Sequence, residues 1–104
     1  MRLAIWILAA MLAAVPALAD QLSAVNAVKG MPKVLDAVPD NAGNLWVSVV
    51  PDPKIQWNDY AGIVCKVVAP HRARIFLVKM VDNSSVHGKR PQDWRLIGGA
   101  NCGL

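Results

Sequence analysis

The first nineteen residues differ in character from the rest of the chain and limit what is left to fold. Seventeen of them are hydrophobic, and Arg2 precedes the apolar run. The run ends in Pro16-Ala17-Leu18-Ala19, which has the small-x-small pattern that a signal peptidase recognises. We expect Pro16 to end the apolar helix and to leave the next three residues extended, with cleavage between Ala19 and Asp20. The pattern predicts a cleaved secretory signal peptide over residues 1–19. The alternative is an uncleaved anchor, because about 16 apolar residues approach a membrane-spanning length.

The remaining residues, 20–104, predict a single small exported domain with no transmembrane segment. They are too few for two domains, and their hydrophobic content of roughly 47% is that of an ordinary globular chain. A domain of this size buries a modest share of its surface, so its core alone gives marginal stability. Without Arg2 the net charge is +3, which is too mild to suggest nucleic-acid binding in an exported protein.

Both cysteines, Cys65 and Cys102, lie in this domain, and an even count in a small exported domain predicts a disulfide. Closing the loop between them would stabilise the fold by about 3–4 kcal/mol. Free or intermolecular thiols and a metal site are the alternatives. The chain has no Cys-x-x-Cys motif, and the spacing of the cysteines relative to His71 and His87 is unlike that of compact zinc sites. We expect no metal and no cofactor.

Hydrophobic periodicity predicts two helices. Residues 20–31 carry an apolar residue at every third position, and Gly30-Met31-Pro32 would stop that helix. Residues 57–69 carry a helical stripe counted from Tyr60, with Ile63 among its members, and Pro70 would end the helix.

Three further segments, 45–50, 74–82 and 94–102, are predicted to be strands. Residues 33–38 fit either a continuation of the first helix or a short strand that enters a turn over 39–44.

These elements predict an α+β or α/β fold that contains a β-α-β unit, with 45–50 and 74–82 as parallel neighbours. We expect a small two-layer sandwich, in which one or two helices cover one face of a three- to four-stranded sheet. The disulfide would join the second helix to the last strand, where Gly98-Gly99 would allow a bulge or a close helix approach. Leu45, Val47 and Val49 share one face of their strand.

The candidate interaction residues are aromatic and basic: Trp46, Trp57, Trp94, Lys89 and Arg90. A tryptophan in a small domain is usually a packing residue, but an exposed one is a candidate recognition anchor. Lys89 and Arg90 lie in a polar loop of eleven residues, 83–93, and loops of that length often carry recognition. Arg72 and Arg74 lie at the other end of the strand before this loop, so a single basic patch is not expected.

We therefore expect a non-catalytic binding module, periplasmic or secreted, whose partner is an envelope or extracellular protein or an anionic polymer. The alternative is a small exported enzyme that uses Asp59 or His71 as acid or base, although no catalytic Ser/His/Asp pattern and no glycine-rich phosphate loop occurs. A third reading is a subunit of an oligomer, joined through an exposed sheet edge at 45–50 or 94–102.

Overall fold

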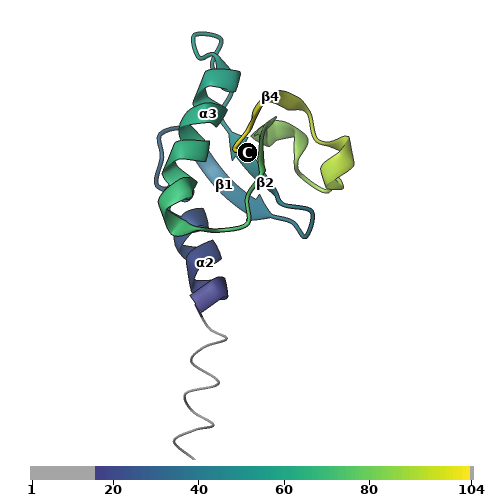
Figure 1. Ribbon diagram of the computed structural model, residues 1–104. Helices are drawn as coiled ribbons and strands as arrows, with labels where there is room; N and C mark the ends of the chain where they lie inside the picture. The colour runs from purple at the N-terminus through teal and green to yellow at the C-terminus, as the bar shows by residue number, and fades with distance from the viewer. Residues whose placement is uncertain (1–15, 104) are drawn as a thin grey trace, which may run out of the picture.

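A four-stranded mixed sheet and two helices make up residues 16–103, the part of the chain that the computed structural model describes (Figure 1). In chain order the elements are α2 (Pro16–Lys29), β1 (Val34–Pro39), β2 (Asn44–Val49), α3 (Trp57–Val68), η1 (Ala69–His71), β3 (Leu77–Asp82), η2 (Asn83–Ser85), η3 (Pro91–Asp93) and β4 (Leu96–Asn101). This arrangement confirms the predicted fold class. Residues 1–15, most of the expected signal peptide, lie outside the described residues.

Helix α2 ends at Lys29, directly before the predicted stop signal at Gly30. It begins at Pro16, so the expectation that residues 17–19 are extended is wrong for the uncleaved chain. Within residues 16–103, no helix is both long and apolar enough to cross a membrane.

The strand order in the sheet is β1-β2-β3-β4. β2 and β3 are parallel and are joined through α3, which confirms the predicted β-α-β unit. The ambiguous segment 33–38 resolves as β1, which pairs antiparallel with β2. β3 begins only at Leu77, later than predicted, because Arg72 adopts a left-handed conformation and the Ile75 N–H donates to the Ala73 carbonyl. β4 also runs antiparallel to β3 and is shorter than the predicted 94–102.

The core lies between the helices and one face of the sheet. Leu45, Val47 and Val49 are fully buried on that face, as the alternation along β2 predicts. The buried stripe of α3 starts at Trp57 rather than at Tyr60 and contains Trp57, Ala61, Val64 and Val68. Ile63, which was expected in the stripe, is 52% exposed, because it falls outside this set of i, i+4 and i+7 positions.

Helix α3 is held tightly to the edge strand β4. The predicted disulfide joins Cys65 of α3 to Cys102, just after β4. A Cβ atom added at Gly98 would lie 2.6 Å from the Cβ of Trp57, so only glycine permits this approach.

The neighbouring glycine is also held to α3, because the side chain of Asn58 accepts a hydrogen bond from the Gly99 N–H at 3.0 Å. Both predicted roles of the Gly-Gly pair are confirmed, because a register irregularity also occurs beside it, at Met80/Val81.

We predict that Gly98→Ala lowers the free energy of unfolding by about 2 kcal/mol, because the added methyl group meets the Trp57 backbone and cannot be relieved by a side-chain rotation. Gly62→Ala is the matched control. No atom lies within 4 Å of a Cβ at Gly62, so alanine in this helix should stabilise the protein by about 0.5–1 kcal/mol. Urea unfolding of both variants measures the difference, and equal effects would contradict the packing described here.

Candidate functional site

The face of the sheet that points away from the helices carries an aromatic and basic surface. Register and alternation place on this face side chains from every strand, and Trp94 lies against them. We call this set the outer surface; it consists of Val38, Trp46, Leu77, Lys79, Trp94 and Leu96. Three of its members are aliphatic and well exposed, with Val38 at 43%, Leu77 at 40% and Leu96 at 52%. Apolar side chains thus surround the tryptophans on a face that no helix covers.

Trp46 lies at the centre of the outer surface and is fixed by three different contacts. The ring of Trp94 meets it edge-on, with 5.5 Å between centroids and an interplanar angle of 88°. The Lys79 ammonium lies 4.6 Å from the Trp46 ring centroid, in cation–π geometry. The indole N–H donates to Oδ2 of Asp40 at 2.9 Å. Trp46 is therefore held in one orientation before any partner arrives.

Asp40, in the turn between β1 and β2, accepts four hydrogen bonds. Oδ1 accepts from the N–H groups of Ala42 and Asn44, and Oδ2 accepts from the Asn44 amide and from Trp46. Partial desolvation of the carboxyl raises its pKa, but these hydrogen bonds together outweigh that effect and lower the pKa to about 2. Asp40 is thus ionised at neutral pH, where it anchors the Trp46 ring.

The segment 83–95 folds back over part of the same face and positions Trp94. Its first anchor is Asp82, which is buried and accepts from the Ser84 N–H and hydroxyl while pairing with Arg95. Hydrogen bonds from Ser84, and then Arg95, lower the pKa of Asp82. The Trp94 indole N–H donates to the Lys89 carbonyl at 3.0 Å. The segment is consequently a fixed structure and not a free loop, and in Figure 1 it lies on the side of the sheet away from α3.

The burial of two side chains on the outer face of the sheet supports this position of the segment 83–95. Ser48 and Val81 lie on the face away from the helices, yet Ser48 is only 6% exposed and Val81 is fully buried. Neither belongs to the core cluster between the sheet and the helices. The segment 83–95 therefore covers one end of the outer face and leaves the Trp46 end open.

The structure brings together four of the five predicted interaction residues. Lys89 and Arg90 are exposed on the segment that carries Trp94, and Arg90 forms an ion pair with Asp93 at 3.6 Å. Trp57 lies elsewhere: it is 8% exposed, packs against Tyr60 and meets Gly98 on the helix side of the sheet. Trp57 is a core residue and takes no part in the outer surface.

The predicted site residues did not include Val38, Leu77, Lys79 or Leu96 of the outer surface, nor Asp40, which holds the Trp46 ring. In the sequence Asp40 looks like an ordinary turn residue. Nothing there shows that its carboxylate accepts a hydrogen bond from Trp46, six residues later on β2. Lys79 gave a usable signal, as the one charge inside an otherwise apolar strand. A lone charge in a strand indicates a side chain that needs a polar or aromatic partner on an accessible face.

The two acid–base candidates lie apart from the outer surface. Asp59 is exposed in the first turn of α3, and His71 hydrogen-bonds through Nδ1 to the Ser23 hydroxyl. Neither Asp59 nor His71 lines the cavity near Phe76 or the cavity near His87. Across residues 16–103, no three His, Cys, Asp or Glu side chains are grouped to hold a metal ion.

The expected sheet edge at 45–50 is wrong, because β2 pairs with a strand on each side. The edges are β1 and β4. On β1 the Ala37 N–H is occupied by the Asp36 carboxylate at 2.8 Å, and Pro39 has no N–H. On β4 the Gly99 N–H is occupied by Asn58. These contacts remove backbone donors that an added strand would need, so the faces are better suited than the edges to binding.

Comparison with protein families, with curated proteins and with solved structures finds no match for this chain.

We predict that Asp40→Asn lowers the free energy of unfolding at pH 7 by about 1–2 kcal/mol, allowing for solvent screening of this half-buried carboxylate. An amide cannot accept all four hydrogen bonds. Because the folded pKa lies below the unfolded value of 3.8, the stabilisation is full above pH 4 and disappears as the pH falls through about 2.

Urea unfolding at several pH values, followed by tryptophan fluorescence, measures this difference. The control is Asp59→Asn, which removes an exposed carboxylate outside the network. A deficit for Asp40→Asn that stays constant from pH 7 to pH 2 would show that the charge of Asp40 is not what holds Trp46.

Proposed function

We propose that the protein is an exported, disulfide-bonded binding module whose outer surface docks against an acidic region of another exported protein. The observation that carries this proposal is the clustering of Trp46, Trp94 and Lys79 with exposed aliphatic side chains on the uncovered sheet face. Tryptophan is enriched among the residues that dominate binding energy at protein interfaces. Their fixed orientation keeps the entropy cost of binding low.

The apolar members of the surface favour a protein partner over an anionic polymer. Val38, Leu77 and Leu96 offer aliphatic area that a charged polysaccharide chain would leave unpaired, whereas a protein partner can bury it. The lysine side chains indicate that the docking region of the partner is negatively charged. Lys79 and Lys89 form no ion pair with any described residue, so they remain available for carboxylates.

Export is supported by the leader pattern and by the disulfide. The first nineteen residues have the n-region, apolar region and small-residue ending of a secretory signal. The Cys65–Cys102 bond is compatible with an oxidising compartment, where such bonds persist. Asp59 and His71, the candidate acid or base of the enzyme alternative, line neither the cavity near Phe76 nor the cavity near His87.

If the protein is exported as proposed, the mass of the chain recovered outside the cytoplasm should correspond to residues 20–104 with one disulfide, two hydrogens lighter than the reduced chain. Mass spectrometry before and after reduction measures both features. A recovered chain that retains its first nineteen residues would contradict cleavage after Ala19.

The docking surface is tested with two matched charge insertions. Leu96→Asp lies on the outer surface and Ile63→Asp on the opposite, helical side, and both wild-type side chains are 52% exposed. We predict that Leu96→Asp weakens capture of an acidic protein from the exported fraction at least about tenfold, while Ile63→Asp leaves capture unchanged. Quantitative pull-down with the purified protein measures both.

The charge requirement is tested with Lys89→Glu/Arg90→Glu. This variant should also lose the captured protein, and capture by the wild type should weaken as salt is raised. Capture that survives Leu96→Asp, or an acidic polysaccharide recovered in place of a protein, would overturn the proposal.

A further inference from the structure

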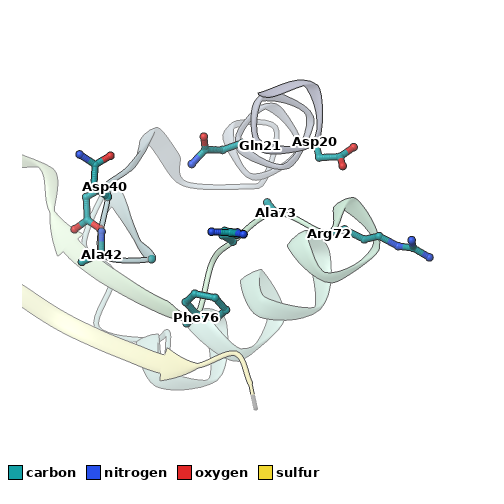
Figure 2. A pocket seen from close by; sticks show the side chains of 10 residues that line it. Asp20, Gln21, Asp40, Ala42, Arg72, Ala73 and Phe76 are labelled. Atoms are coloured by element: carbon teal, nitrogen blue, oxygen red, sulfur yellow. The ribbon is translucent and has the colours of Figure 1, made fainter. Parts of the chain in front are cut away.

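A second site is suggested by a cavity at the far end of the sheet from the segment 83–95. The cavity has a volume of about 530 Å³, within the range of small-molecule sites. Three segments line it: the start of the mature chain at Asp20 and Gln21, the turn over 40–43, and the link over 72–76 between η1 and β3 (Figure 2).

The hydrogen-bonding capacity left in this cavity consists mainly of donors. Asp40 lines it, but a carboxylate offers about four lone-pair sites and Asp40 already accepts four hydrogen bonds. In Figure 2 the Asp20 carboxylate points away from the cavity. The guanidinium groups of Arg72 and Arg74 form no ion pair with any described residue. The formal charges of Asp20 and Asp40 balance those of the two arginines in the lining, and the free hydrogen-bond donors suit an acceptor-rich, anionic group.

Arg72 occupies a conformation that its residue type disfavours. Its φ of 56° is left-handed, where glycine is the usual residue at the end of a helical turn. In Figure 2 its side chain extends outward from the mouth of the cavity, so it reaches a ligand by a change of rotamer, which is fast for an exposed arginine.

One wall of the cavity is aromatic. Phe76 is 47% exposed and packs against Gly43, where an added Cβ would lie 2.5 Å from the ring. The absence of a side chain at Gly43 therefore lets the ring lie close against the turn. A half-exposed phenylalanine ring in a cavity that two arginines also line offers stacking and charge recognition in one site.

We propose that this cavity binds a small ligand in which a phosphate or carboxylate is attached to a flat apolar group. The oxyanion pairs with Arg74 and Arg72, and the apolar group stacks on Phe76. The Gln21 amide, also in the lining, supplies a further hydrogen bond. This site is separate from the outer surface, although Asp40 lines the cavity and also holds the Trp46 ring.

The test is a titration of the full chain with phenyl phosphate, benzoate, inorganic phosphate and phenol, followed by the amide NMR signals of residues 40–43 and 72–76. We expect phenyl phosphate or benzoate to bind saturably, with a dissociation constant of about 1 mM or tighter. Whichever binds more tightly identifies the oxyanion. Inorganic phosphate and phenol, which each lack one half of the ligand, should bind at least about tenfold more weakly.

Three variants test the assigned residues. Arg74→Gln should weaken binding at least about tenfold. Arg72→Gly should also weaken binding while the melting temperature stays level or rises, because glycine relieves the left-handed strain. Arg90→Gln removes an arginine at the other end of β3 and should bind as the wild type does.

Two results would overturn the proposal. One is the absence of saturable binding by both phenyl phosphate and benzoate up to about 10 mM, tenfold above the expected constant. The other is binding that survives Arg74→Gln unchanged. Leu96→Asp separates this site from the proposed function, because it should abolish protein capture and leave the affinity for the small ligand unaltered.

Discussion

The contact between α3 and β4 is the constraint on which the rest of the structure depends. Trp57 packs directly over Gly98, and the Cys65–Cys102 disulfide closes the same interface at its other end. A domain of this size has a small core, and the disulfide adds about 3–4 kcal/mol to it by restricting the unfolded chain. Because both helices pack on one face of the sheet, no α-helix packs on the other face.

That second face is organised by polar contacts rather than by a second core. Asp40 fixes the Trp46 ring from the turn, and Asp82 anchors the segment that brings in Trp94. The two carboxylates lie at opposite ends of the sheet, and the tryptophans meet between them. The result is an aromatic pair held rigidly on a surface with exposed aliphatic side chains and unpaired lysines, which is the arrangement that supports the proposed role in protein binding.

Much of the fold follows from local sequence patterns. Alternation identifies the buried face of β2, and the strand–helix–strand order predicts the parallel pair and hence the mixed sheet. The errors have physical causes. Ile63 was misplaced because the apolar residues of α3 allow two overlapping stripes, and the extended start of β3 was lost because Arg72 turns the chain in a way its residue type does not signal.

The candidate site was harder to predict because it joins residues far apart in the chain. Trp46 and Trp94 were each identified, but their contact depends on how the segment 83–95 folds back across the sheet, which no local pattern encodes. The same applies to Asp40, whose importance appears only when its bond to Trp46 is seen. Trp57 was predicted as an interaction residue but lies in the core, because composition alone does not distinguish a core tryptophan from a surface one.

Hydrogen–deuterium exchange on the partner-bound protein tests most directly whether a partner binds at the outer surface. If it does, exchange becomes slower across the segment 83–95 and β3, while α2 and the exposed side of α3 are unchanged. Protection confined to α2 and α3, with the segment 83–95 exchanging as in the free protein, would contradict it.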